Sequence, residues 1–164
     1  VRNIGLCNMK TMLVRDILSY ARIRPAVLQV EIHPFNTQEK LLKFCRQSGI
    51  AVTAFSSFGG FSYVELGMAQ KEDSVLTTSV IEAISKAHAR SPGQVALRWA
   101  VQRGTAIIPK TLSPARLAEN IGVFDFNLTD AEMKAIDGLN KNQRYNDPGH
   151  FCQVAFNTFY PIYD

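Results

Sequence analysis

The chain has 164 residues, of which 46% are apolar and 20% are charged, and its 18 Lys and Arg exceed its 14 Asp and Glu to give a net charge of +4. This composition is typical of one folded domain and excludes an intrinsically disordered chain. No stretch reaches the ~18 consecutive apolar residues of a membrane span, and the basic residues form no run or aromatic-interleaved stripe of the kind that binds nucleic acid.

Short apolar runs alternate with amphipathic helical patterns, which is typical of βα units in a parallel sheet. In the first third of the chain, the runs and helices are expected in turn at residues 4–6, 10–22, 26–32, 37–47 and 51–55. Asn36 with Glu39 has the spacing of an N-cap and its returning carboxylate, and Gly49 stands where a helix-terminating glycine belongs.

A loop rich in Gly, Ser and Phe is expected from residue 56 to about 76, and loops of that length are usually functional. Two helices should follow. Ser79 with Glu82 begins the first, and Ser91, Pro92 and Gln94 begin the second, which Gly104 ends. A fourth strand is expected at 105–109, then helices capped by Ser113 and by Thr129 with Glu132. The aromatic tail at 143–164 is expected to be irregular.

Strands that are apolar on both faces need helices on both sides or around a closed barrel. Two architectures fit the four strand-then-helix units: a small doubly wound sheet, which includes a flavodoxin-like domain, and half of a (β/α)₈ barrel. Composition does not separate them. The chain starts with Val1 rather than Met, and we expect it to be part of a longer protein of about 300 residues.

In α/β proteins, ligands bind at the carboxyl ends of the strands. The polar residues expected there include Cys7, Asn8, Gln29, Ser56 and Lys110. Their amide, hydroxyl and thiol groups can hold a polar ligand but have little acid–base power. For any one of them taken alone, ordinary turn chemistry is the favoured explanation.

The clearest physical signal is the segment from Lys110 to Asn120. A strand ends on Lys110, and Arg116 occupies the third position of the next helix, where the helix dipole disfavours a cation by roughly 0.3–1 kcal/mol. A bound anion would reverse that preference. First-turn N–H groups with Lys110, Thr111, Ser113 and Arg116 therefore predict a phosphate site. The alternative is a solvated surface with ordinary basic residues.

Other chemistries find no support in the sequence. There is no GxGxxG, GxxxxGK[ST] or GxSxG motif. His33, His88 and His150 lack metal-ligand spacing, and Cys7, Cys45 and Cys152 form no CxxC pair, so no metal site is predicted. Sparse, unpaired cysteines suit a reducing compartment, and we expect a cytoplasmic location. Glu31 and His33 alternate on one strand and could pair, although this is a weak motif.

Six segments in order carry a resemblance to a known family: IGLCNM (4–9), RPAVLQVEIHPF (24–35), VTAFSSFG (52–59), SPGQVALRWAVQRG (91–104), IIPKTLSPARLAENIGVFDF (107–126) and RYNDP (144–148). Together they resemble the carboxyl-terminal half of the aldo-keto reductase family, closest to its xylose/aldose reductase branch. The resemblance implies the last four βα units of a (β/α)₈ TIM barrel over 1–142, followed by a C-terminal substrate-pocket loop over 143–164. It also implies an NADPH/NADP⁺ cofactor and reduction of a small aldehyde or sugar substrate.

Carried over position by position, the resemblance implies roles for several residues. Asn8 and Gln29, beside Cys7, would hydrogen-bond the nicotinamide carboxamide, and Phe55 would stack on its ring. The residues that would line the pyrophosphate are Ser56, Phe58 and Ser62. Those that would hold the adenosine 2′-phosphate are Lys110, Thr111 and Arg116, with Ser113 capping the helix. Glu119 and Asn120 would contact adenine.

Two departures weaken the expected nicotinamide contacts. Cys7 stands where the family usually has serine, and a thiol is a weaker hydrogen-bond donor. Phe55 stands where tyrosine is usual. The family's catalytic Asp, Tyr, Lys and His have no matching segment here, so no catalytic residue is assigned.

The chain is thus expected to supply the cofactor-binding half of an oxidoreductase. The alternative is a truncated, non-catalytic NADP-binding or scaffold half-barrel. Because its edge strands would be unpaired, a homodimer is also a possibility.

Overall fold

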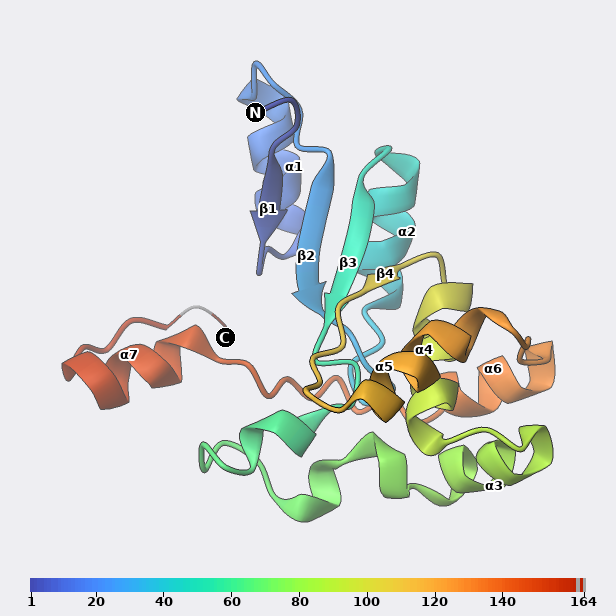
Figure 1. Ribbon diagram of the computed structural model, residues 1–164. Helices are drawn as coiled ribbons and strands as arrows, with labels where there is room; N and C mark the ends of the chain where they lie inside the picture. Colours follow the sequence, from blue (N-terminus) through green and yellow to red (C-terminus); the bar gives the residue numbers. More distant parts are fainter. Residues whose placement is uncertain (162, 164) are drawn as a thin grey trace.

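The structure, a computed structural model, describes residues 1–161 and Tyr163. Its centre is a parallel sheet of four strands, which lie side by side in chain order (Figure 1). The strands are β1 (Gly5–Cys7), β2 (Val27–Glu31), β3 (Ala51–Phe55) and β4 (Ala106–Ile107). The expected alternation of strands and helices is confirmed.

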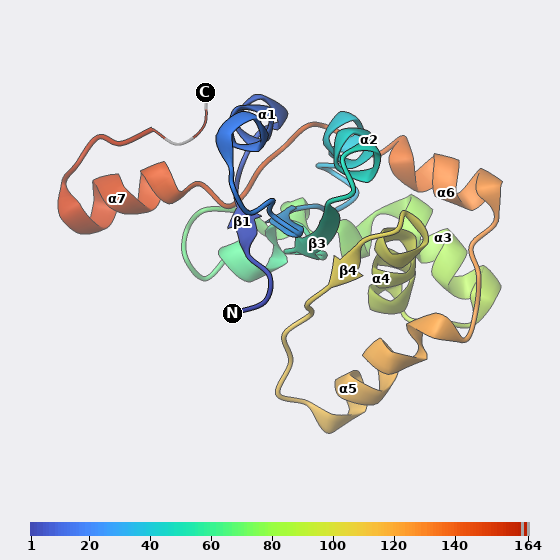
Figure 2. The same ribbon diagram turned by 90° about the horizontal axis from the view of Figure 1, so that it is seen from above.

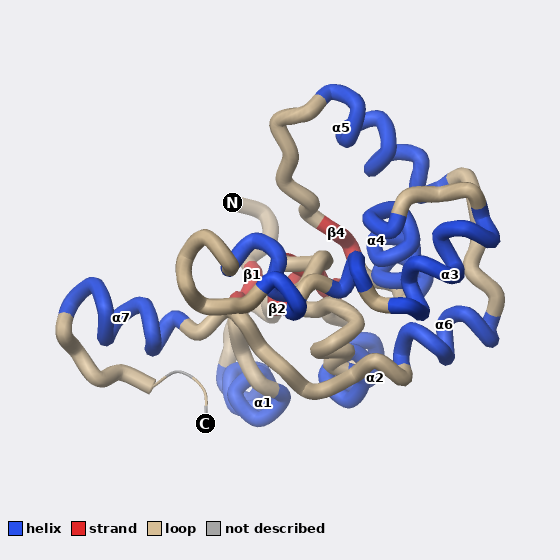
Figure 3. The backbone as a smooth tube through the Cα atoms, turned by 90° about the horizontal axis from the view of Figure 1, so that it is seen from below, coloured by secondary structure: helices blue, strands red, loops and turns tan. Residues whose placement is uncertain are grey.

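The described residues form seven α-helices: α1 (Thr11–Tyr20), α2 (Glu39–Gln47), α3 (Ser79–His88), α4 (Pro92–Gln102), α5 (Pro114–Ile121), α6 (Asp130–Asp137) and α7 (Pro148–Phe156). Seen from above, α1, α2 and α4 lie along one side of the curved sheet, with α3 and α6 outside α4 (Figure 2). The view from below shows the same layering, with α5 and α7 reaching away from the sheet on opposite sides (Figure 3). None of the described helices is long and apolar enough to cross a membrane.

Alternation along the strands divides the sheet into two different faces. Leu28 and Val30 of β2 are buried in the main apolar core, whereas the intervening Gln29 is only half-buried. Val52 and Ala54 of β3 repeat the pattern around the half-buried Thr53. The helices therefore cover one face, and the other carries Cys7, Gln29, Thr53 and Ala106 in one paired row.

The strand order decides between the two architectures that the sequence left open. In a doubly wound sheet the order reverses at a switch point, and helices cover both faces. Here the order is consecutive, and the helices that contact the main core share one face of the sheet. This arrangement is consistent with part of an eight-stranded barrel.

Several helix starts match the sequence patterns. Ser91 and Gln94 form a reciprocal capping box at α4, and Thr129 and Glu132 form another at α6. Ser113 caps α5 by accepting a hydrogen bond from the N–H of Arg116. The three hydroxyl-bearing residues each satisfy an N–H group that the helix itself leaves unpaired.

Other expected boundaries are wrong. Asn36 does not cap α2, because its side-chain amide donates to the carbonyl of Glu31, and Gln38 in the left-handed conformation is the N-cap instead. The N-cap of α3 is Thr78 rather than Ser79. Strand β4 pairs over two residues, not over 105–109.

The expectation of an irregular tail is also wrong, since residues 148–156 form α7. Asp147 accepts a hydrogen bond from the N–H of Gly149, and Pro148 occupies the first helical position. Both are ordinary helix-start signals. The helix leaves Phe151, Val154 and Phe156 exposed.

A second, smaller core lies under the loop that follows β3. Phe35, Tyr63, Val75 and Tyr145 form it together with two alanines. The loop contains three short 3₁₀ helices, η1 (Gly60–Tyr63), η2 (Lys71–Asp73) and η3 (Val75–Thr77). The segment expected to be a long loop is thus ordered by packing against the C-terminal part of the chain.

Gly60→Ala is expected to destabilise the fold by about 1–3 kcal/mol through overpacking in this second core. A Cβ at this position would lie 2.7 Å from the Cβ of Asp73 and 2.9 Å from that of Ala69. Gly93→Ala is the matched control, because its Cβ would meet nothing closer than 3.7 Å and it lies in α4. It should be neutral or stabilising. Denaturant unfolding of both variants measures the difference; equal stabilities would contradict the packing described for the loop.

Candidate functional site

The carboxyl ends of β1, β2 and β3 bring four predicted site residues together. Cys7 of β1 pairs with Gln29 of β2, and Glu31, two residues further along β2, pairs with Phe55 of β3. The N–H of Asn8 donates to the carbonyl of Gln29 at 2.9 Å, which holds the first residue after β1 against β2. One thiol, two amides and one aromatic ring therefore gather at one end of the sheet.

Asn8 has two features that suit a ligand-binding residue. Its φ is +54°, a left-handed conformation that asparagine tolerates better than most residues. Its Oδ1 is buried and has no hydrogen-bond partner among the described residues. Since buried polar atoms are nearly always paired, this oxygen fits an N–H donor supplied by a ligand.

The second group of predicted residues lies in the loop after β3, and its members, Ser56, Phe58 and Ser62, differ in their contacts. Ser56 has a φ of +55° and shares a 2.7 Å hydrogen bond with the hydroxyl of Tyr63. Phe58 packs against the second core, so its ring already has a structural role. Ser62 is exposed on η1. Of the three, Ser62 is the least committed to other contacts.

The connection from β4 to α5 holds the predicted phosphate-binding residues. Figure 2 shows this connection leading away from the sheet before the chain turns back into α5. The Thr111 hydroxyl accepts the N–H of Ser113 at 3.1 Å, so its own O–H can still donate. Lys110 and Arg116 are exposed, and neither forms an ion pair among the described residues.

The backbone contributes less to this site than the sequence suggested. Pro114 has no N–H, and the N–H of Arg116 is bonded to the Ser113 hydroxyl. The N–H of Leu117 is bonded to the Ser113 carbonyl. An anion here would therefore depend mainly on the two cationic side chains and the two hydroxyls.

The predicted adenine contacts lie further along α5. The Glu119 carboxylate accepts a hydrogen bond from the Ser91 hydroxyl at 3.4 Å, and its carbonyl accepts one from Gln94. Asn120 is half-buried. These bonds tie α5 to the start of α4, so Glu119 has a structural role as well as the predicted one.

The weakest sequence motif proves to be a central contact. Glu31 and His33 are both fully buried and lie 2.8 Å apart between Oε1 and Nε2. The Glu31 carboxylate also accepts the N–H of Tyr145 at 2.8 Å and the N–H of Asn146 at 2.9 Å. Alternation of Glu31 and His33 was the only signal in the sequence, since the backbone donors lie more than 110 residues away.

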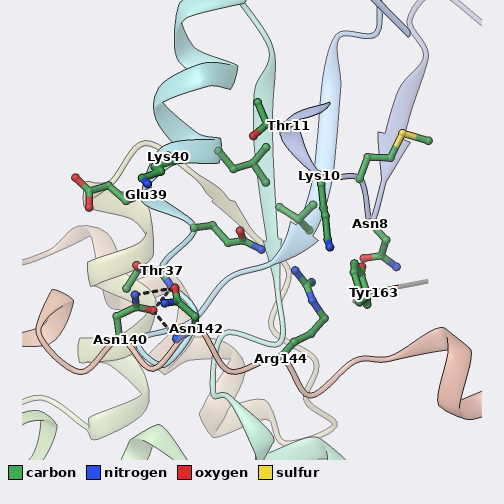
Figure 4. Close-up of a pocket in the computed structure, with 14 residues that line it drawn as sticks. Asn8, Lys10, Thr11, Thr37, Glu39, Lys40, Asn140, Asn142, Arg144 and Tyr163 are labelled. Carbon is green, nitrogen blue, oxygen red and sulfur yellow. Dashed lines mark hydrogen bonds between the residues drawn. The ribbon is translucent and has the colours of Figure 1, made fainter. Parts of the chain in front are cut away.

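A separate cavity of about 430 Å³ opens beside this contact, at the N-terminal ends of α1 and α2 (Figure 4). Three cations, Lys10, Lys40 and Arg144, line it together with the carboxylate of Glu39. The Arg144 guanidinium lies 3.9 Å from the ring centre of Tyr163 and 4.0 Å from Oε2 of Glu31. Asn8 is the one predicted site residue on its wall, so most of the predicted site lies elsewhere.

Curated proteins of similar sequence include probable NAD(P)H-dependent D-xylose reductases of several fungi. That of Emericella nidulans is 50% identical over 152 residues, which are 92% of this chain and 48% of that protein. That of Aspergillus niger is 44% identical over 164 residues, 99% of this chain and 50% of that protein. That of Aspergillus fumigatus is 49% identical over 90% of this chain. The chain thus spans about half the length of the relatives it matches.

The sequence model of the aldo/keto reductase family matches residues 1–141, which include all four strands and the β4–α5 connection. The expected resemblance is therefore confirmed. On the length of this match and the identity to these relatives, the chain belongs to the aldo/keto reductase family.

Proposed function

We propose that this chain supplies the cofactor-binding half of an NADP(H)-dependent oxidoreductase that reduces aldehydes, including open-chain sugars. The observation that carries the proposal is the orphaned Oδ1 of Asn8, the residue that follows β1 directly after the Cys7–Gln29 pair. The relatives named as NAD(P)H-dependent D-xylose reductases support the cofactor and the substrate class.

The residues present fit a nicotinamide dinucleotide at two separate places. Asn8 can accept an N–H from the carboxamide, Gln29 can add a second amide contact, and the face of Phe55 can stack against the ring. Lys110 and Arg116, with the Thr111 and Ser113 hydroxyls, can hold the 2′-phosphate. Ser56, Phe58 and Ser62 lie on the loop between these two ends, where we propose that they line the pyrophosphate.

In this proposal the chain binds and orients, and it does not transfer the proton. The chemistry that a reduced nicotinamide supplies, once bound, is a hydride for the carbonyl carbon. Asn8 and Gln29 fix the plane of the carboxamide, and Phe55 fixes the face of the ring, which is a positioning contribution. We propose that the acid which protonates the carbonyl oxygen lies outside these residues.

Residues 1–142 form the barrel half in this proposal, and residues 143–164 border the substrate. The exposed aromatic residues of the second segment, Phe151, Phe156, Phe159 and Tyr160, suit such a border.

A second candidate function is a non-catalytic half-barrel that binds NADP(H) or serves as a scaffold, alone or as a homodimer. The observation that favours it is the sheet itself: β1 and β4 each have a neighbour on one side only, and the face bearing Cys7 and Ala106 is open. The unpaired backbone N–H and C=O groups of such edge strands can pair with a further strand. Enzymatic activity separates the two candidates.

The full protein that contains this chain is expected to oxidise NADPH when D-xylose or another aldehyde is added. The measurement is the loss of NADPH absorbance with and without the aldehyde. Binding of NADPH without turnover would favour the scaffold, and the absence of both would overturn the proposed function.

Replacing Lys110 and Arg116 together by alanine should weaken NADPH binding about 10- to 100-fold, because each cation makes a charge-assisted contact with the phosphate. NADH, which lacks that phosphate, should be affected much less. Lys134→Ala with Arg22→Ala removes the same charge from exposed positions elsewhere and serves as the control. Titration with both nucleotides tests the site; unchanged affinity for both would show that the phosphate lies elsewhere.

Cys7→Ser should strengthen the hold on the nicotinamide by roughly two- to fivefold, since a hydroxyl is a better donor than a thiol. The matched control is Cys152→Ser on α7, away from the strand ends. The comparison requires the NADPH dissociation constant of each variant. A gain in the control, or none in Cys7→Ser, would separate Cys7 from the cofactor.

A further inference from the structure

One tyrosine links two segments that are distant in sequence and have different roles in the proposed function. Tyr145 is only 4% exposed and belongs to the segment 143–147, which follows the barrel half. Its ring lies among residues of the loop 56–77, which carries the predicted pyrophosphate contacts. Its backbone is bonded to the end of β2.

The backbone of Tyr145 is held by a hydrogen bond to the Glu31 side chain. Both oxygens of the buried Glu31 carboxylate are used: Oε1 accepts the N–H of Tyr145 and Oε2 that of Asn146. Backbone N–H groups bonded to a buried carboxylate are among the stronger hydrogen bonds in proteins. Glu31 lies two residues beyond Gln29 on β2, so the segment is held directly at the nicotinamide end of the predicted site.

The side chain of Tyr145 reaches the loop through its hydroxyl. The O–H donates to Oδ1 of Asp73 at 3.1 Å, and the Nε2 of Gln143 donates to the same oxygen at 3.4 Å. Oδ2 of Asp73 accepts the N–H of Gln70 at 2.8 Å. The Asp73 carboxylate is thus shared between the far end of the loop and the C-terminal segment.

The near end of the loop contacts the Tyr145 ring. The ring of Tyr63 stacks on it with centroids 6.4 Å apart and planes 21° apart, and the Tyr63 hydroxyl is bonded to Ser56. A Cβ on Gly60 would lie 3.2 Å from the Tyr145 ring, so the loop backbone runs closely over it. Both ends of the loop therefore meet the same side chain.

The Tyr145 hydroxyl stays protonated in this arrangement, so it can donate its hydrogen bond to Asp73. Burial raises the pKa of Tyr145 above its usual value, and the hydrogen bond and charge of Asp73 and the charge of Glu31 raise it further. The hydroxyl therefore keeps its proton at neutral pH, as donation to a carboxylate requires. A proton-transfer role is not needed to explain its position.

We propose that Tyr145 is a positioning residue that couples the cofactor-binding loop to the substrate-side segment through its hydrogen bond to Asp73. The inference rests on the proposed function, because it assigns the loop to the cofactor and the segment to the substrate. Loosening this one bond should then affect both ligands together. It should also let the loop open more often.

Tyr145→Phe in the full protein removes the O–H and keeps the ring and both backbone bonds. We expect the NADPH dissociation constant and the KM for the aldehyde each to rise roughly three- to tenfold. Amide hydrogen exchange should quicken in residues 57–76. Tyr20→Phe makes the same chemical change at an exposed position on α1 and should alter neither constant.

Asp73→Ala removes the acceptor of the same bond from the loop, and it replaces Tyr145→Phe as the test if that variant does not fold. If the pair acts through one bond, the double variant should be no worse than the more affected single variant. A lower melting temperature with unchanged dissociation constant and KM would reduce Tyr145 to a structural role and overturn the inference. So would additive effects in the double variant.

The two proposals can fail separately. If replacing Lys110 and Arg116 weakens NADPH binding while Tyr145→Phe leaves both constants unchanged, the coupling is wrong and the proposed function stands. If the unmodified protein binds no NADPH, both are wrong.

Discussion

The two-residue period of the parallel strands is the constraint on which the rest depends. Leu28, Val30 and their counterparts must face the helices to build the core, which forces Gln29 and Thr53 to the other face. A one-residue slip would bury the amide and expose the leucine. The register that builds the core therefore also aligns Cys7 with Gln29, and it places the candidate site at one end of the sheet.

The buried Glu31 extends this order to the C-terminal segment. A carboxylate with no solvent access is tolerated only when its lone pairs are satisfied, and removing a partner from such a group costs about 3–5 kcal/mol. His33 and the N–H groups of Tyr145 and Asn146 satisfy it here. The same bonds bring residues 143–147 to the end of β2, so one buried charge determines where the last part of the chain begins.

What the sequence predicted well was local. Capping boxes at Ser91 and Thr129 are set by residues three apart, and they formed as expected. Asn36 failed as a cap because the carbonyl of Glu31 binds its amide, and β4 is short because only Ala106 and Ile107 pair with β3. The strand-end residues followed from the βα pattern and the family resemblance. The contacts of Glu31 and Tyr145 could not be predicted, since their partners are about 70 and 115 residues distant.

Helix α5 is held far more loosely than the strands. None of its residues is fully buried, and Leu117 and Ile121 expose 51% and 72% of their surface. Local unfolding free energies follow buried apolar contact, so this helix should melt in a sub-global step well below the global transition. A ligand that binds its first turn would then be linked to the folding of the last βα unit, and the stabilisation would grow with the logarithm of the ligand concentration over its dissociation constant.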